Sequence, residues 1–254
     1  MTFIRTKIIC TIGPATDSLP MLRKLYKAGM NVVRINMSHA THKYAASIIS
    51  KINKINNETD HLEQKIAILL DTQGPEIRTG DTTLPIDLEV GDEVTLTVRD
   101  QVDVETSSIK VNYKDLVHSV DVGSQISVDN GLINFKVLSK DSETLLCKVL
   151  HGGKLGSKRH VNLPGVRINL PSITSKDIED INFGIKYNVD FIAASFVRNK
   201  NDLEILDEIL KNKQSQIKII AKIENHDGLN NIDEICQMAW GVMVARGDLG
   251  IETS

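Results

Sequence analysis

The stretch NVVRINMSH (residues 31–39) alternates apolar and polar side chains from Val33 onward. Neighbouring residues of a β-strand point to opposite faces, so the alternation predicts a strand with one apolar face and one polar face. The apolar set is Val33, Ile35 and Met37, and the polar set is Arg34, Asn36 and Ser38. If the apolar face packs against outer helices, the polar face points inward at the carboxyl end of the strand.

Short apolar strands and amphipathic helices alternate through the first 72 residues. The predicted strands are IICTIG (8–13), NVVRINM (31–37) and AILLDT (67–72). A helix is expected over residues 19–28. A second helix is indicated by apolar residues at helical spacing, which are Ala45, Ile48, Ile49, Ile52 and Ile55. The predicted order is β-α-β-α-β.

The texture changes between about residues 80 and 163. Short alternating runs are separated by Gly-Asp, Val-Gly-Ser and Asn-Gly turns, and this spacing predicts a small antiparallel barrel or sandwich. The runs are EVTLTV (93–98), QISV (125–128), INFKVL (133–138) and TLLCKVL (144–150).

The β-α alternation resumes near residue 170. Thr174 and Asp177 have the spacing of a capping box ahead of a helix. Further strands are expected at FIAASFV (191–197), IKIIAKI (217–223) and GVMVAR (241–246), with helices over 202–210 and 229–238 between them. We therefore divide the chain into residues 1–74, an inserted β-domain over 75–169, and residues 170–254.

Six β-α strands fit either an open doubly wound sheet or a barrel. Polar side chains recur at the carboxyl ends of the predicted strands, which is where TIM barrels build their active sites. The fold class is therefore predicted as α/β, a TIM (β/α)8-type barrel that is incomplete in this chain and carries an inserted small all-β barrel. Beyond the polar face of residues 31–39, the strand-end residues are Asp71, Thr72, Ser195, Lys222, Glu224 and Asp248.

The residue types at these ends suggest how a phosphorylated anion and a metal are held. Glu224 and Asp248 offer hard oxygen ligands for Mg²⁺, and Lys222 is a point charge suited to a moving phosphoryl group or a developing enolate. Arg34 and Arg78 are forked donors able to grip phosphate. A further set of oxygens is compatible with a monovalent cation: Asn36, Ser38, Asp71 and Thr72.

The glycines Gly247 and Gly250 follow the sixth strand, where the chain is expected to turn into a helix. Backbone N–H groups at such a turn are able to receive a carboxylate or a phosphate.

Composition excludes several classes of partner. Charged residues make up 25% of the 254 residues and the net charge is −3, so the basic field of a nucleic-acid or anionic-membrane binder is missing. Aromatic residues make up only 4%, and the largely aliphatic, often β-branched apolar positions suit buried parallel strands. The scattered cysteines (Cys10, Cys147, Cys236) and the lack of a signal-like or membrane-spanning segment predict a reduced, cytoplasmic protein.

Six motifs in this order resemble the pyruvate kinase family: KIICTIGPAT, GMNVVRINMSH, LLDTQGPEIRTG, VNLPG, KIIAKIENHDG and GVMVARGDLGIE. The resemblance implies phosphoryl transfer from phosphoenolpyruvate to ADP, giving pyruvate and ATP in glycolysis, with Mg²⁺ (or Mn²⁺) and K⁺. It also implies a homotetramer for the full-length protein and a mobile lid for the β-domain.

The resemblance assigns roles to single residues. It implies that Lys222 stabilises the phosphoryl group in flight and that Arg34 meets that group. The backbone at Gly247 and Asp248 is expected to receive the substrate carboxylate. The remaining implied roles are Mg²⁺ binding by Glu224 and Asp248, K⁺ binding by Asn36, Ser38, Asp71 and Thr72, and nucleotide contacts by Arg34, Arg78 and Arg159.

Four positions bear on how this chain compares with other members of the family. Glu76 resembles the K⁺-dependent form, since K⁺-independent relatives tend to have lysine there. Gln73 and Arg159 stand where many members have lysine, and Asn130 stands where aspartate is common. Arg159 keeps its charge, whereas Asn130 loses one in the lid.

The chain stops at IETS, just past the sixth strand. We therefore expect a fragment of a longer enzyme, with two open sheet edges, that is aggregation-prone or inactive when isolated. Two other functions remain open: a truncated, non-catalytic homologue that acts as a binding or regulatory partner, and a Mg²⁺-dependent lyase acting on pyruvate enolate. The lyase needs no nucleotide lid, so Arg78 and Arg159 argue against it.

Overall fold

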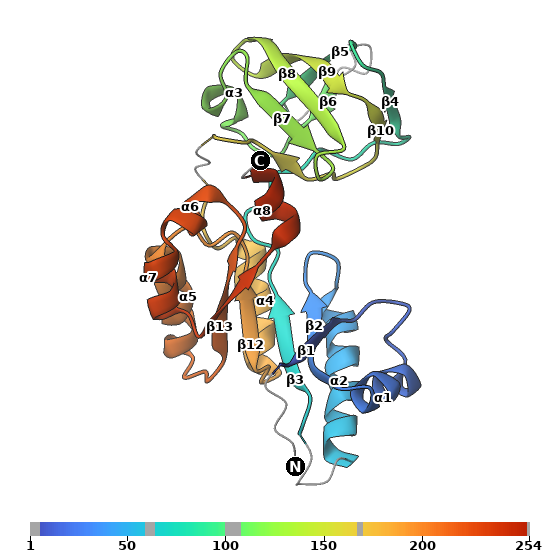
Figure 1. Ribbon diagram of the computed structural model, residues 1–254, viewed down its shortest axis with the longest axis vertical. Coiled ribbons are helices and arrows are strands. Elements are labelled where there is room, and N and C mark those ends of the chain that lie inside the picture. Colours follow the sequence, from blue (N-terminus) through green and yellow to red (C-terminus); the bar gives the residue numbers. More distant parts are fainter. Residues whose placement is uncertain (1–5, 59–63, 100–107, 167–169, 253–254) are drawn as a thin grey trace. The chain divides into compact units, whose positions relative to one another are not determined.

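A computed structural model describes residues 6–58, 64–99, 108–166 and 170–252 (Figure 1). The chain forms two compact units, and each is described by itself. The first comprises Met1–Pro75, Ser172–Ile223 and Asp227–Val244, and the second comprises Glu76–Pro171, Glu224–His226 and Ala245–Ser254. None of the helices in the described part of the chain is long and apolar enough to cross a membrane.

The first unit is built on a six-stranded sheet whose pairings are all parallel. Its strands lie in chain order once the β-domain is skipped: β1 (Ile8–Thr11), β2 (Met30–Asn36), β3 (Ala67–Asp71), β12 (Phe191–Ala194), β13 (Lys218–Ile223) and β14 (Gly241–Val244). Neighbouring strands that follow one another through helical crossovers are the pattern of a (β/α)8 barrel, here with six strands. The α/β fold class is therefore confirmed as an incomplete TIM-type barrel.

Helices connect these strands, and α1 packs on β2 and α2 while α5 packs on β13 and α7 (Figure 1). The helices of the barrel unit in the described residues are α1 (Leu19–Lys27), α2 (His42–Glu58), α4 (Ser175–Lys186), α5 (Lys200–Asn212), α6 (His226–Asn230, from its second residue onward) and α7 (Ile232–Met238). The buried residues of α2 are the five apolar residues that predicted it. The predicted capping box of α4 is present, because Thr174 accepts from the Asp177 N–H and Asp177 reaches back to the Thr174 N–H.

The strand faces agree with the alternation in the sequence. In β2 and the residues after it, Val33, Ile35 and Met37 are buried, whereas the polar set between them is half-buried. At the sheet edges, apolar residues of β1 and β14 stay exposed, as in Ile9 (47%) and Val244 (61%). Within the described residues β1 and β14 are therefore the two open edges of the sheet, as the sequence predicted, and both expose apolar side chains.

Several predicted elements differ from the observed ones. The strand predicted over 8–13 ends at Thr11, and the strand predicted over 241–246 ends at Val244, with Arg246 beginning a helix. The strand predicted over 191–197 ends at Ala194, because Phe196 adopts a positive φ of 56° that turns the chain away from the sheet. The helix predicted over 229–238 is split into α6 (His226–Asn230) and α7. At the break, the Asn231 side chain donates to the Arg198 carbonyl oxygen (2.9 Å), which holds the chain to the preceding loop.

The β-domain of the second unit is a small barrel. Its larger sheet has the order β11-β7-β8-β9-β5-β6, and residues Arg78 and Thr79 bridge to His160 beside β11 and to Val111 beside β6. The two edges are thereby joined, as predicted for an all-β barrel. The strands are β4 (Ile86–Leu88), β5 (Glu93–Thr97), β6 (Ser108–Lys110), β7 (Gln125–Val128), β8 (Ile133–Lys140), β9 (Thr144–His151), β10 (Gly153–Leu155) and β11 (Val161–Asn162).

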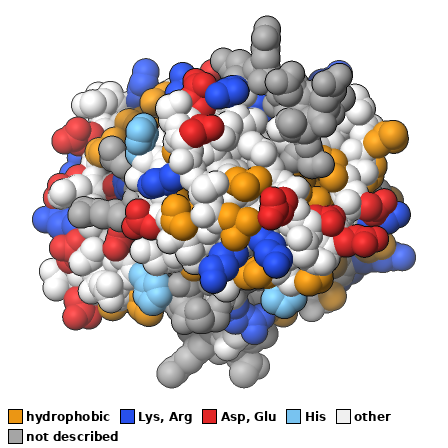
Figure 2. All heavy atoms as spheres, turned by 90° about the horizontal axis from the view of Figure 1, so that it is seen from above, with side chains coloured by type: hydrophobic (Ala, Val, Ile, Leu, Met, Phe, Trp, Pro, Cys, Tyr) orange, Lys and Arg blue, Asp and Glu red, His pale blue; other side chains and the backbone are white. Residues whose placement is uncertain are grey.

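Two short helices complete the second unit. They are α3 (Leu116–Ser119) and α8 (Arg246–Glu252). The core of the β-domain is one apolar cluster centred on Phe135, Ile126 and Leu96. On the molecular face drawn in Figure 2, lysine and arginine side chains lie among acidic and apolar ones, which agrees with the balanced composition.

Candidate active site

Lys222 lies near the carboxyl end of β13, and the residue is only 8% exposed to solvent. Its ammonium donates to the Ser195 hydroxyl oxygen (2.7 Å) and lies 3.0 Å from Asp71 Oδ1. The desolvation penalty for burying an ammonium is several kcal/mol. Lys222 can therefore remain buried only because these contacts compensate for the lost water. Three neighbouring strands thus hold one buried cation.

Asp71 is the shared counter-ion of this cluster. The residue ends β3 and is 1% exposed. Its Oδ2 accepts from Arg34 Nε (2.6 Å), and a second Arg34 nitrogen also contacts it, while its Oδ1 faces Lys222. Arg34 further donates to the Thr11 hydroxyl (2.7 Å) at the end of β1. One carboxylate on β3 therefore orients two cations, one on the adjacent strand β2 and one on β13, the second strand along on the other side.

The predicted monovalent-cation ligands lie close to one another but already make internal hydrogen bonds. Asn36 Oδ1 accepts from the Ser38 N–H (3.0 Å), and the Thr72 carbonyl oxygen accepts from the Ser195 hydroxyl (2.7 Å). Amide and carbonyl oxygens have two lone pairs, so each keeps acceptor capacity for a cation. Asp71 is different, because both of its oxygens face cationic side chains.

Helix α4 supports the turn that carries Asn36 and Ser38. Lys176 on α4 donates to the Met37 carbonyl oxygen (2.8 Å) and to the buried carboxylate of Asp180 (2.7 Å). His42 contacts the other oxygen of Asp180 (2.7 Å). This support was not predicted from the sequence. Lys176 and Met37 are 139 positions apart, and a contact over that separation leaves no local pattern in the sequence.

The predicted nucleotide arginines of the β-domain are tethered at the surface. Arg78 Nε donates to Glu76 (2.6 Å) and its Nη1 to the Lys158 carbonyl oxygen (2.7 Å). The Arg159 side chain is 46% exposed and lies 3.4 Å from Asp129 Oδ1. Both guanidinium groups are oriented while part of their surface stays in contact with solvent.

The predicted magnesium carboxylates and anion-binding backbone lie in the second unit. Glu224 follows the last residue of β13 and is 1% exposed, while Asp248 lies in the first turn of α8 with its Oδ1 3.8 Å from His160 Nδ1. Gly247 is also in that first turn, where N–H groups have no intrahelical partner. In the described residues no group of three His, Cys, Asp or Glu side chains forms a metal site. Mg²⁺ needs only one or two carboxylates with water and substrate.

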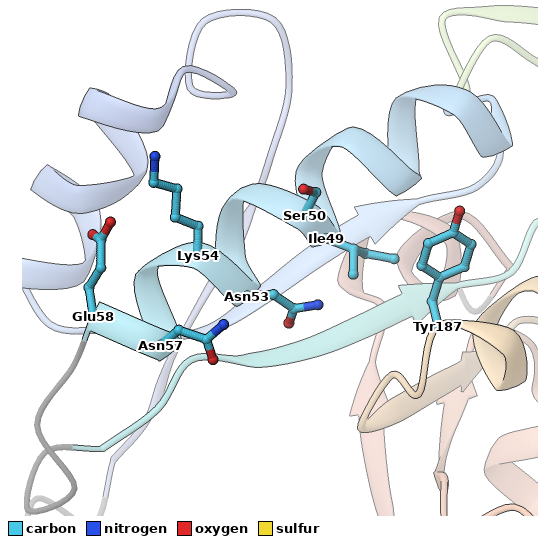
Figure 3. A pocket seen from close by; sticks show the side chains of 7 residues that line it. All are labelled: Ile49, Ser50, Asn53, Lys54, Asn57, Glu58 and Tyr187. Atoms are coloured by element: carbon cyan, nitrogen blue, oxygen red, sulfur yellow. The ribbon is translucent and has the colours of Figure 1, made fainter.

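A pocket of about 500 Å³ lies away from all of these residues (Figure 3). It is formed along α2, with Tyr187 at its other side; Asn53 and Asn57 extend toward the side of Tyr187, whereas Lys54 points away from it. None of the residues predicted to act on substrate lines it.

Sequence reasoning named the residues of the cluster but not their mutual contacts. Ser195 was singled out only as a polar strand end, and Asp71 only as a polar strand end and a K⁺ ligand. A signal was available, because a carboxylate at the end of an apolar strand needs a cationic partner when it is buried, and Arg34 and Lys222 are cations near the ends of other predicted strands.

Comparison with known proteins agrees with this fold. The family model described as pyruvate kinase, barrel domain, matches residues 3–254. The chain is 47% identical over 251 residues to the pyruvate kinase of Staphylococcus aureus strain MRSA252, and equally to that of Staphylococcus epidermidis strain RP62A. Each alignment covers 98% of this chain and 42% of the relative. The chain therefore spans less than half the length of these relatives, and it belongs to the pyruvate kinase family.

Proposed function

We propose that this chain carries the phosphoryl-transfer site of a pyruvate kinase, which moves the phosphoryl group of phosphoenolpyruvate to ADP. The observation that carries the proposal is the convergence of Arg34 and Lys222 on the buried Asp71. In the reaction, the bond between phosphorus and the enol oxygen breaks and a bond to the terminal ADP oxygen forms. The remaining enolate takes up a proton to give pyruvate.

Lys222 and Arg34 would stabilise the transferring group. Charge in phosphoryl transfer spreads over the equatorial oxygens, so catalysis depends on cations placed in advance. Lys222 supplies a point charge and Arg34 a planar fork, and each is already oriented by Asp71. The incoming phosphoryl oxygens would take over part of the role that Asp71 plays toward both cations.

Two cations fit the donor sets. Glu224 and Asp248 would hold one Mg²⁺ or Mn²⁺, and their hard carboxylate oxygens suit such an ion. K⁺ would be held by the oxygens of Asn36, Ser38, Asp71 and Thr72. When bound, these ions supply positive charge that neutralises the developing negative charge on substrate.

The other substrate groups would be met by the second unit. The backbone at Gly247 and Asp248, in the first turn of α8, would receive the substrate carboxylate. Arg78 and Arg159, together with Arg34, would contact the nucleotide phosphates. The β-domain, over about residues 75–169, would serve as a lid that excludes water from the reaction.

The protein is proposed to act as a cytoplasmic glycolytic enzyme, as a homotetramer when full length. A pyruvate-enolate lyase would have no use for Arg78 and Arg159 as oriented, partly exposed phosphate-binding groups. A non-catalytic homologue would have no need to keep Lys222 and Asp71 buried together, because an ion pair without a function is often replaced by apolar residues at no cost in stability.

The test is ATP formation by the protein that carries these residues. With phosphoenolpyruvate, ADP, Mg²⁺ and K⁺, we expect pyruvate and ATP in equal amounts, and we expect a chelator to abolish both. Replacing K⁺ by tetramethylammonium is expected to lower the rate severalfold or more, and a rate indifferent to K⁺ would refute the K⁺ site and the interpretation of Glu76. Pyruvate released without ATP would support a different reaction and contradict the proposal.

A further inference from the structure

Ser195 is a buried hydroxyl that the proposed reaction does not yet use. It follows the last residue of β12, is 5% exposed, and precedes Phe196 with its positive φ. We propose that Ser195 is a positioning residue that fixes the ammonium of Lys222 at the place where it meets the phosphoryl group. This inference rests on the proposed function, and the geometry that supports it lies within the barrel unit.

The Ser195 hydroxyl both donates and accepts a hydrogen bond. Its hydroxyl donates to the Thr72 carbonyl oxygen (2.7 Å), and a hydroxyl has a single proton to give. Its oxygen therefore accepts at the second contact, where the Lys222 ammonium donates over 2.7 Å. Asp71 Oδ1, at 3.4 Å, is a second and more distant acceptor for the Ser195 proton. Because a lysine ammonium only donates, the Ser195 oxygen accepts from Lys222 whichever of the two acceptors takes its proton.

The backbone holds Ser195 in place from two sides. The Ser195 N–H donates to Thr72 Oγ1 (3.2 Å), and the Thr72 N–H donates to the Ala193 carbonyl oxygen (3.0 Å). On the other side lies Gly74, where an added Cβ would come within 2.7 Å of Ser195 Cβ. The close approach and the φ of +73° both require glycine at that position.

Gly74 is itself anchored to helix α4. Its N–H donates to Asp177 Oδ1 (3.0 Å), and Asp177 is the buried member of the capping box at the start of that helix. The position of Ser195 is therefore determined by β3, β12 and α4 together. Such support is what a side chain needs if it is to place another group to within a fraction of an ångström.

Lys222 is the group that needs placing. A lysine ammonium sits on a flexible four-carbon stem, and rotation about that stem moves the charge by ångströms. Asp71 and Ser195 contact it from two different strands, and Ser195 does so without adding charge. Loss of the Ser195 hydroxyl would remove one of these two contacts and leave the ammonium less restrained around Asp71. The expected cost falls on kcat, since the interaction matters most in the transition state.

The first arm of the test compares Ser195→Ala with Ser127→Ala. Ser127 is also a buried serine (8% exposed), it lies in the β-domain, and its hydroxyl donates to Asn134, so its removal controls for the loss of a buried hydroxyl. We expect Ser195→Ala to lower kcat about tenfold or more, in line with the loss of a hydrogen bond to a charged group, with the KM for phosphoenolpyruvate changed less than about threefold. Equal kcat values for the two variants would overturn the proposal.

The second arm needs no turnover. Acetylation of Lys222 by acetic anhydride, followed by mass spectrometry in the protein without substrate, measures how firmly the amine is held. We expect Ser195→Ala to accelerate the modification of Lys222 severalfold relative to Lys140, whose ammonium donates to two backbone carbonyl oxygens in the β-domain. An unchanged ratio would overturn the positioning role.

Two safeguards keep the outcomes distinct. If Ser195→Ala fails to fold, Ser195→Cys preserves the shape with a weaker acceptor, and the same two readouts decide. If the wild-type protein makes no ATP, the proposed function fails, while the acetylation ratio still decides whether Ser195 holds Lys222.

Discussion

The barrel unit and the β-domain bury different kinds of polar group. In the described part of the barrel unit, the buried polar residues include ions: Asp71, Asp177, Asp180, Asp202 and Lys222. In the described part of residues 76–171, the buried polar residues are all neutral: Thr79, Thr97, Ser127 and Asn162. The second unit also buries the carboxylate of Glu224, but this residue follows β13 and lies outside residues 76–171. The contrast therefore holds between the barrel unit and the β-domain itself.

This contrast separates two uses of charge. A buried ion must be paired and hydrogen-bonded, so its geometry is fixed by the fold around it. A surface ion such as Arg159 contributes little to stability but is free to exchange its partner for a ligand. The barrel unit therefore holds charges whose geometry is fixed, as the proposed reaction centre requires, and the β-domain holds surface charges that can exchange partners, as the proposed nucleotide contacts require.

The largest effect is expected for Asp71→Asn. The variant keeps the shape of the side chain but removes the anion between Arg34 and Lys222. We expect the free energy of unfolding of the protein to fall by about 3–5 kcal/mol, as for a broken buried ion pair, measured by urea denaturation. A loss below about 1 kcal/mol would mean that the buried ions of the barrel are no more costly than surface ones.

A pH dependence is expected from the core of the β-domain. Burial raises the pKa of the Cys147 thiol from 9.0 to about 12. The raised folded-state pKa contributes stability that is fully present below about pH 9 and is lost as the pH rises toward 12, because the unfolded chain releases the proton first.

The control for this effect is Cys147→Val, which has no thiol to titrate. The unfolding free energy of the wild-type protein should decrease more steeply than that of the variant between pH 9 and pH 11. Parallel curves for the two proteins would show that burial does not raise the pKa of the Cys147 thiol. They would contradict the view that the β-domain core disfavours charged groups.

A smaller effect, confined to function, is expected for Arg159→Ala. Removing this half-exposed guanidinium should raise the KM for ADP roughly tenfold while leaving the unfolding free energy within about 0.5 kcal/mol of wild type. Steady-state kinetics measures the KM for ADP, and urea denaturation measures the free energy of unfolding. A variant with unchanged KM for ADP would remove Arg159 from the nucleotide site.

The smallest effect is expected for Asp129→Asn, the surface counterpart of Asp71→Asn. Asp129 contacts Arg159 at 3.4 Å and has a φ of 55°, a conformation that asparagine tolerates well. The unfolding free energy should change by less than about 0.5 kcal/mol. A change as large as that of Asp71→Asn would erase the distinction between the two units.

Much of the fold was predictable because its signals are local. The alternation after Val33, the apolar spacing in α2 and the capping box of α4 each depend on residues within a few positions of one another. The strand end at Ala194 was missed, because the apolar run FIAASFV continues past the turn and its pattern does not reveal the positive φ of Phe196.

The contacts of the site were less predictable than its members. Lys222, Arg34 and Asp71 were named from strand ends, but the sequence does not say which strands are adjacent or how far each side chain reaches across them. Ser195 and Gly74 meet only because β3 and β12 pair, and that pairing joins residues separated by the whole β-domain. Sequence patterns predict the faces of strands, whereas contacts between strands depend on the register and curvature of the sheet.

The most direct test of the central claim compares two lysines of the same strand. Lys222→Met and Lys218→Met each remove one ammonium from β13, but Lys218 is exposed at the start of that strand. We predict that Lys222→Met lowers the rate of ATP formation from phosphoenolpyruvate and ADP by about a thousandfold or more, with Mn²⁺ binding retained, and that Lys218→Met stays close to wild type. Near-normal turnover by Lys222→Met would contradict the account.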